Sequence, residues 1–98
     1  MEIKIEHGDA LIVSLKGRLD TVTSVELGKK MEEVEVNEPL VIMDMKELEY
    51  ISSAGLRLLL SLKKNYAASG KELEVHNLNP VCKEVFRVTG FQNILTVK

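Results

Sequence analysis

Two adjacent serines and a glycine stand where an apolar stretch of strand length gives way to a strongly apolar helix. They are Ser52, Ser53 and Gly55, followed by a leucine-rich run. The first backbone N–H groups of a helix lack partners within the helix, and the helix dipole is positive there. A serine oxygen at this place is therefore suited to hold an anion. We expect the function of the chain to reside at this junction.

Helix capping is the commoner role of serine at such a position, and the residues alone leave that role open. A single cap does not require both Ser52 and Ser53. Glycine in the first turn of a helix costs about 1 kcal/mol relative to alanine, so Gly55 indicates a close approach of the backbone, if only to the neighbouring strand. Asp20 is a second candidate because it also follows a strand and precedes a helix, although capping is again its commoner role.

Catalytic and metal sites are not indicated by the residue pattern. A nucleophilic serine needs a base, but His7 lies in a predicted hairpin turn and His76 at the end of a predicted strand. Neither a G-x-S-x-G elbow nor a glycine-rich phosphate loop is found. The two histidines and the lone cysteine are too widely separated to show metal-ligand spacing. We therefore expect a binding module with no catalytic residues, metal or cofactor.

Length and charge narrow the class of protein further. A chain of 98 residues predicts one domain spanning 1–98 with a single core. A net charge of −2 without a cluster of Lys or Arg argues against nucleic acid as a partner. No stretch is long enough to span a bilayer, and Met1–Ile5 lacks the apolar core of a secretory signal, so we expect a cytoplasmic protein. Cys82 is expected to be a buried thiol.

The periodicity of apolar residues predicts alternating strands and helices. Strands are expected at 2–6, 10–15, 40–44, 72–76 and 94–97, and helices at 21–36, 53–68 and 80–89. Asp20 or Thr21 should cap the first helix, Gly17 should break the second strand, and residues 45–51 should form an exposed connection. Leu27, Met31 and Val34 should share one face of the first helix, and Val81, Val85, Phe86 and Val88 should be the apolar residues of the third.

This order of elements predicts an α/β fold with a mixed sheet packed against helices. The opening hairpin is antiparallel, and each later strand-helix-strand unit returns in the same direction, so the remaining pairing should be mostly parallel. Ligands of such sheets bind beyond the carboxyl ends of the strands. The loops at Leu19-Asp20 and Ser52-Ser53 both lie at those ends, so we expect them to form one surface.

Several stretches together resemble the STAS family, whose domains occur in anti-sigma factor antagonists and sulfate transporters. They are Gly17-Arg18-Leu19-Asp20, the strand ending at Asp44, the segment Leu48-Glu49-Tyr50-Ile51-Ser52-Ser53-Ala54-Gly55-Leu56, Asn79-Pro80 and Thr89-Gly90-Phe91. The resemblance covers nearly the whole chain. Because no membrane segment accompanies the domain, the chain resembles a bacterial anti-sigma factor antagonist more than the tail of a transporter.

The resemblance implies a mechanism of partner switching. In that family the unmodified antagonist binds an anti-sigma factor that is also an ATP-dependent serine kinase, and this frees the sigma factor. The kinase phosphorylates the antagonist and ends the association, and a serine phosphatase reverses the modification. By position the phosphoacceptor falls on Ser53, while Ser52 replaces the aspartate common in the family and is the alternative acceptor. Asp20 matches the acidic position beside the phosphorylated helix start.

Residues near the two helix starts are the candidate partner contacts. They are Asp20, Thr21, Thr23, Met45, Tyr50, Ser52, Ser53, Gly55 and Leu56. Met45, Tyr50 and Leu56 are the apolar members, with ordinary core packing as the alternative. Two other functions stay open: a constitutive STAS scaffold subunit of a signalling or lipid-transport assembly, in which the serines are only structural, and a domain that binds a small molecule or nucleotide at the same edge.

Overall fold

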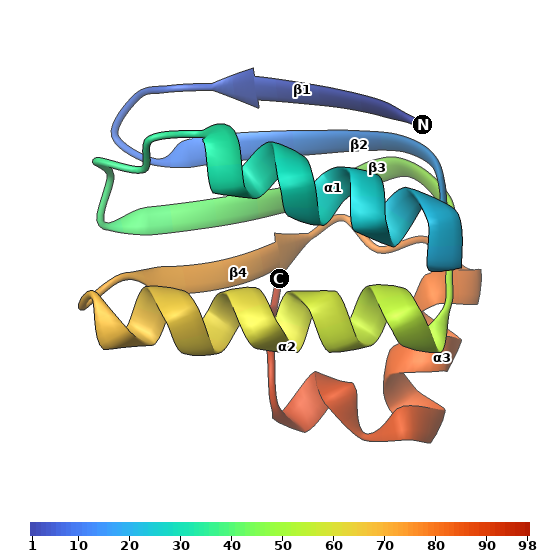
Figure 1. The fold of residues 1–98 in the computed structure, drawn as a ribbon. Helices are drawn as coiled ribbons and strands as arrows, with labels where there is room; N and C mark the ends of the chain where they lie inside the picture. The colour runs from blue at the N-terminus through green and yellow to red at the C-terminus, as the bar shows by residue number, and fades with distance from the viewer.

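A five-stranded sheet with helices packed against it organises the chain (Figure 1). The computed structural model describes residues 1–98. The strands are β1 (Glu2–Glu6), β2 (Leu11–Leu19), β3 (Leu40–Ile51), β4 (Glu72–His76) and β5 (Thr96–Val97), and the helices are α1 (Thr21–Glu33), α2 (Ser53–Ala68), α3 (Pro80–Thr89) and a 3₁₀ turn at Phe91–Asn93. The strands lie in the order β1-β2-β3-β4-β5. β1 is antiparallel to β2 and all other neighbours are parallel, which confirms the predicted mixed sheet.

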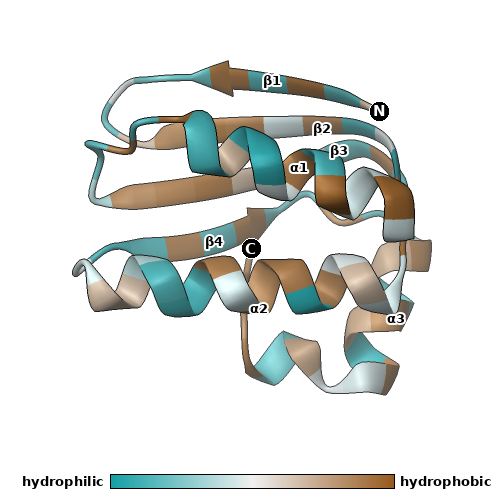
Figure 2. Ribbon diagram, viewed as in Figure 1, coloured by the Kyte–Doolittle hydropathy of each residue, from teal (hydrophilic) through white to brown (hydrophobic).

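One hydrophobic core joins a single face of the sheet to all three helices. In β2, Leu11, Val13 and Leu15 are buried while the residues between them are half-buried, as expected when alternate side chains point to opposite faces. These three belong to a cluster of 21 buried residues that also includes side chains from α1, α2 and α3. Figure 2 shows the hydrophobic colour gathered along the central strands β2 and β3. α1 lies over β2 and β3, α2 lies along β4, and the two helices contact one another (Figure 1).

A polar side chain caps the start of each helix at the predicted position. Asp20 caps α1 and Ser52 caps α2. Asn79 caps α3, since its Oδ1 accepts the Cys82 N–H at 2.7 Å. Its Nδ2 also donates to the Leu48 carbonyl at 3.0 Å and so ties α3 to β3. The caps were predictable because each satisfies backbone groups close to it in sequence.

The prediction that Gly17 breaks the second strand is wrong. β2 continues through it to Leu19. Gly17 has a φ of 111°, a conformation open to glycine but strained for other residues. The pairing of β2 with β3 shifts register on either side of it, between Ser14 and Lys16 and between Gly17 and Arg18. The glycine therefore accommodates an irregularity within the strand and does not end it.

The prediction that residues 45–51 form an exposed connection is also wrong. They are the second half of β3 and pair with the second half of β2, ending in register at Ile51 and Leu19. Met45, Leu48 and Ile51 are buried. The register shifts of β2 against β3 interrupt strict alternation, so these apolar residues recur every third position and do not show the period of two that identifies a strand.

The end of the chain differs in detail from the prediction. The expected strand at 94–97 is a two-residue strand, β5, that follows the 3₁₀ turn. Of the apolar residues predicted for α3, Phe86 is buried whereas Val81 and Val88 are exposed. Cys82 is buried beside Phe86, as predicted, and burial raises the pKa of its thiol.

Candidate functional site

The ends of β2 and β3 bring the two helix starts together at one edge of the sheet. Leu19 and Ile51 are paired in register as the last residues of their strands. The next residue after β3 continues the contact, since the Ser52 N–H donates to the Leu19 carbonyl at 2.9 Å. The predicted surface at the carboxyl ends of the strands is thus formed by Asp20 and Ser52 with the first turns of α1 and α2.

The start of α1 carries a reciprocal cap built around a carboxylate. Asp20 Oδ1 accepts the N–H groups of Val22 and Thr23, both at 3.0 Å. In return, Thr23 Oγ1 accepts the Asp20 N–H at 2.8 Å. The Thr23 N–H is the main cause that lowers the pKa of Asp20, with smaller contributions from the Thr23 hydroxyl, the Val22 N–H and the charge of Arg18. Asp20 is therefore a fixed anion at this edge.

The start of α2 carries a weaker and neutral cap. Ser52 Oγ accepts the Gly55 N–H at 3.3 Å and makes no other hydrogen bond. Ser53 is the first residue of α2, its side chain is exposed, and its hydroxyl has no hydrogen-bond partner in the chain. The two serines thus differ in role: the Ser52 oxygen caps the helix and the Ser53 oxygen is free.

Gly55 allows α2 to sit directly on the ends of the two strands. A Cβ at this position would lie 2.9 Å from side-chain carbons of both Leu19 and Ile51. Separations this short do not occur between real side chains, so the position excludes even alanine without movement of the neighbours. The close approach predicted from the sequence is real, and the strand ends are what approaches. Gly55 is buried and shapes the site from below.

Of the three apolar candidates, Met45 and Leu56 belong to the core and Tyr50 reaches the surface. Met45 is fully buried and Leu56 is only 2% exposed, so their burial supports core packing, the alternative that the sequence left open. Tyr50 is half-buried, and the Arg18 guanidinium lies 4.5 Å from the centre of its ring. Because neighbouring side chains along a strand point to opposite faces, this cation–π contact lies on the face of the sheet away from the buried Leu19 and Ile51.

A groove between α1 and α2 opens beside these helix starts. It has a volume of about 580 Å³ and is lined by Thr21, Ser24, Val25, Gly28, Lys29, Glu32, Ala54, Arg57 and Leu58. Of these lining residues, only Thr21 was among the partner contacts predicted from the sequence. Two patterns in the sequence could have indicated further residues of the groove. Val25 lies outside the buried face defined by Leu27 and Met31. Arg57 follows Ser53 by four residues, which is one helical turn.

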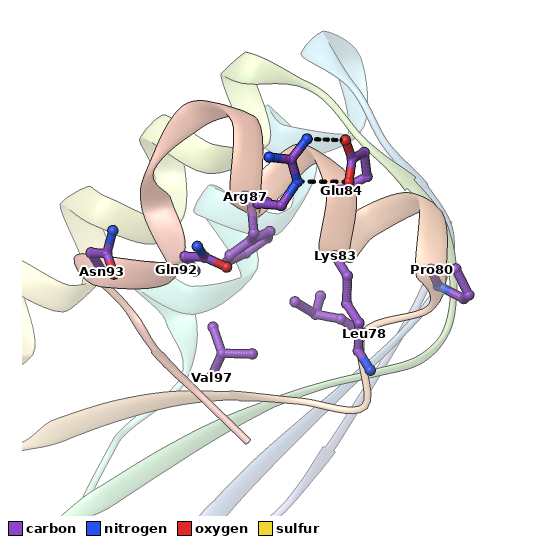
Figure 3. Close-up of a pocket in the computed structure, with 9 residues that line it drawn as sticks. Leu78, Pro80, Lys83, Glu84, Arg87, Gln92, Asn93 and Val97 are labelled. Atoms are coloured by element: carbon purple, nitrogen blue, oxygen red, sulfur yellow. Dashed lines mark hydrogen bonds and ion pairs between the residues drawn. The ribbon is translucent and has the colours of Figure 1, made fainter.

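A second depression lies between α3, the 3₁₀ turn and β5 (Figure 3). Its volume is about 590 Å³. Apolar side chains from Leu78 and Val97 line it, with Lys83 and Arg87 among the polar residues. The Arg87 guanidinium is held by both oxygens of Glu84 through Nε and an Nη, so its charge is already matched within α3.

Both histidines are engaged away from Ser53. His7 Nδ1 lies 2.9 Å from a Glu38 carboxylate oxygen at the opposite edge of the sheet. His76 Nε2 lies 2.9 Å from Glu74 Oε1, and His76 pairs with Asp44 in the middle of β3. The hydrogen bond from His76, followed by that from Lys98, holds the pKa of Glu74 below its ordinary value. Neither histidine is therefore placed to activate Ser53.

No group of three or more His, Cys, Asp or Glu side chains is arranged to hold a metal ion. None of the helices combines the length and apolar character needed to cross a membrane.

Comparison with known proteins identifies the family. The profile of the STAS domain matches residues 2–98. The chain belongs to the STAS domain family. This confirms the resemblance found in the sequence, and the match spans all five strands and three helices of the domain.

Relatives of this STAS domain include named anti-sigma factor antagonists. BtrV of Bordetella bronchiseptica, which carries that name, is 31% identical over 99 residues, covering 99% of this chain and 85% of BtrV. The anti-sigma-B factor antagonist of Listeria monocytogenes is 26% identical over 99 residues, covering 100% of this chain and 87% of that protein.

Solved structures share the fold. The anti-sigma factor antagonist SpoIIAA in its unphosphorylated form superposes with a TM-score of 0.83 at 18% identity, over 99% of this chain and 88% of SpoIIAA. Its phosphorylated form superposes with a TM-score of 0.70 at 17% identity, over 99% of this chain and 91% of that one. At such identities the likeness shows the common fold.

Proposed function

We propose that this STAS domain is a cytoplasmic anti-sigma factor antagonist controlled by phosphorylation of Ser53. Unmodified, it binds an anti-sigma factor that is an ATP-dependent serine kinase and thereby frees a sigma factor. Phosphorylation ends the association, and a serine phosphatase restores it. The domain itself is a binding protein and a substrate, not a catalyst. The names of its relatives and the two forms in which SpoIIAA has been solved support this proposal.

One observation carries the choice of residue. The Ser53 hydroxyl is exposed and unbonded, whereas Ser52 Oγ is already held by the Gly55 N–H at 3.3 Å. A kinase must align the hydroxyl of its substrate with a phosphoryl group, so a free hydroxyl is more readily used than one occupied in a cap. Modification of Ser52 would also remove the acceptor that closes the first turn of α2.

A phosphate on Ser53 changes the charge of the surface without requiring a change of fold. Phosphoserine carries about −1.5 to −2 charges, and the first turn of a helix tolerates an anion. At a docked interface the same group must lose water near the fixed carboxylate of Asp20, where an unpaired buried charge is costly. A penalty of about 3 kcal/mol would weaken binding by more than a hundredfold. The phosphorylated chain should keep its melting temperature within about 5 °C of the unmodified chain.

The proposed contact surface consists of the candidates that reach solvent. Thr21 and Ser53 are exposed, and Asp20, Thr23, Tyr50 and Ser52 are partly accessible. Met45, Gly55 and Leu56 lie beneath this surface, so their role in binding is to hold the helix starts in place. Substitutions that add charge or bulk at the first group should alter binding directly, and those at the second group should act through stability.

The test uses the purified chain with the anti-sigma factor kinase of the same organism and ATP. We expect one added phosphate, mapped to Ser53, in the wild type and in the Ser52→Ala variant, and none in Ser53→Ala. Ser53→Ala should bind the kinase as the wild type does, and Ser53→Asp about a hundredfold more weakly. Calorimetry measures the affinity of both Ser53 variants for the kinase.

Three outcomes would count against the proposal. A phosphate mapped to Ser52 would correct the acceptor. Equal affinity of the Ser53→Ala and Ser53→Asp variants would remove the switch. A complex that survives unchanged with and without ATP would favour the scaffold function, in which the serines are structural.

A further inference from the structure

The groove between α1 and α2 presents exposed aliphatic surface next to Ser53. Val22 is 78% exposed and Val25 is 58% exposed, on the side of α1 away from the buried Leu27 and Met31. Val25 lines the groove, and the half-buried Leu58 of α2 lines it from the other side. Most of the accessible wall of the groove is apolar. Each aliphatic side chain that a partner covers here would contribute to binding through removal of its surface from water.

The groove is long enough for a short helix to lie along it. Its wall on α1 runs from Thr21 to Glu32, about 17 Å at the rise of an α-helix, which corresponds to about three turns of a docked helix. At its centre Gly28 removes a side chain: a Cβ there would lie 3.4 Å from Leu58 Cδ1. The missing side chain deepens the channel between the two helices, a shape typical of surfaces that accept an amphipathic helix.

Two cations on the groove have no carboxylate partner. Lys29 and Arg57 line it, and neither takes part in any ion pair of the structure. The single acidic residue of the lining, Glu32, lies at the end away from Ser53. Toward Ser53 the groove therefore carries an unpaired cation, Arg57, with the aliphatic side chains of Val25 and Leu58 farther along it, which is complementary to a partner segment that presents aliphatic side chains and a carboxylate.

We propose that this groove docks an amphipathic helix of the anti-sigma factor, with an acidic side chain of that helix on Arg57. The proposal rests on the function proposed above and extends it in two respects. It places the contact along the length of α1 and α2 and not only at their starts. It also gives phosphorylation a specific target within the domain.

Arg57 connects the groove to the switch. It follows Ser53 by four residues in α2, so the two side chains are neighbours on the same face, and an anion that precedes a cation by this spacing is the favourable arrangement. A phosphate on Ser53 pairs with the Arg57 guanidinium in a bidentate contact. The partner carboxylate then loses its cation and faces the negative phosphate in its place, so binding fails for both reasons.

Binding of the purified anti-sigma factor tests the groove. Val25→Glu should weaken binding about thirtyfold, because it removes aliphatic surface and sets a carboxylate against an acidic helix. Arg57→Gln should weaken it about tenfold. The matched controls are on α3: Val88→Glu, at a residue 64% exposed, and Lys83→Gln should bind as the wild type does. Circular dichroism establishes that each variant is folded.

Phosphorus NMR tests, in the absence of a partner protein, whether the phosphate on Ser53 pairs with the Arg57 guanidinium. The probe is the chain with phosphoserine incorporated at position 53, in wild-type and Arg57→Gln forms. The second ionisation of phosphoserine has a midpoint near about pH 6. Arg57 should lower this midpoint by roughly 0.5 pH unit relative to Arg57→Gln, and 1 M salt should reduce the difference. Equal midpoints would overturn the capture.

The results separate the groove from the function that it serves. If Ser53→Asp loses binding while Val25→Glu and Arg57→Gln bind normally, the groove proposal is wrong and the proposed function stands. If the control variants on α3 weaken binding as much as the groove variants, the docking surface lies elsewhere. If the wild-type chain does not bind the anti-sigma factor, both proposals are overturned together.

Discussion

The two helix starts at the functional edge have the same plan but different chemistry. Each consists of a strand end, a polar cap and an exposed hydroxyl at the first helical position: Asp20 and Thr21 in α1, Ser52 and Ser53 in α2. In α1 the cap is a carboxylate that accepts two N–H groups and is held in return by the threonine at the third position. In α2 the cap is the neutral hydroxyl oxygen of Ser52, which accepts a single hydrogen bond of 3.3 Å.

The two helix starts also differ at the third helical position. In α1 this position is Thr23, whose side chain completes the reciprocal cap. In α2 it is Gly55, because the side chains of Leu19 and Ile51 occupy the place of any Cβ. Close packing of α2 on the strand ends thus prevents a reciprocal cap, and because the cap residue Ser52 is neutral, the N–H groups of the first turn have no anion. An added phosphate is therefore favoured at Ser53, while at Thr21 it would be repelled by Asp20.

Of the changes in stability that follow from comparing the two helix starts, the largest is expected at Gly55. Gly55→Ala should destabilise the fold by about 1–3 kcal/mol, since its Cβ requires movement of Leu19 and Ile51. Urea denaturation measures the change. The matched control is Gly28→Ala, where a Cβ would only touch the flexible end of Leu58 and the gain in helix propensity should stabilise by about 0.5–1 kcal/mol. Equal stability of the two variants would show that α2 is not seated as tightly as described.

The charged cap should matter more to stability than the neutral one. Asp20→Ala removes a carboxylate that accepts two N–H groups, and we expect the melting temperature to fall by roughly 5 °C. Calorimetry of the variant beside the wild type gives this value. A smaller fall in melting temperature for Asp20→Ala than for Ser52→Ala, which removes the cap of α2, would reverse the expected order of the two caps.

The neutral cap should contribute less because its single bond is long. Ser52→Ala should lower the melting temperature by about 2–3 °C. Ser24→Ala is the control, a serine-to-alanine change that removes no hydrogen bond. The Ser24 hydroxyl is buried without a hydrogen-bond partner, so its removal should leave stability unchanged or raise it slightly. A larger loss in Ser52→Ala than in Asp20→Ala would contradict the comparison.

The smallest effect is a difference in acid sensitivity between the two starts. The pKa of Asp20 is lowered from an ordinary 3.8, chiefly by the Thr23 N–H, so its ionised form stabilises the folded state. This contribution is complete above the unfolded value and is lost as the pH falls through the folded one. The melting temperature of the wild type should therefore approach that of Asp20→Asn below about pH 3.8, with a constant small gap above about pH 5. A gap that does not narrow as the pH falls below about 3.8 would show that the Asp20 charge is not responsible.

Local patterns predicted much of the fold and part of the site. The caps were predicted to within a residue, at Asp20 or Thr21, at Ser52 or Ser53 and at Asn79, because a cap satisfies backbone groups within three residues of itself. The mixed sheet followed from the order of elements. The second half of β3 was missed because the irregular pairing around Gly17 hides its alternation, and that pairing joins residues more than thirty positions apart.

The sequence by itself determined that a pair of serines follows a buried strand and opens an apolar helix, because these are properties of neighbouring residues. Only the tertiary structure decided which serine keeps a free hydroxyl, why Gly55 admits no side chain, and that Met45 and Leu56 are covered. Only it brought Val25 of α1 and Arg57 of α2 onto one groove. These features depend on how α2 packs on two strand ends and on α1, and such contacts between distant segments leave no local pattern to read.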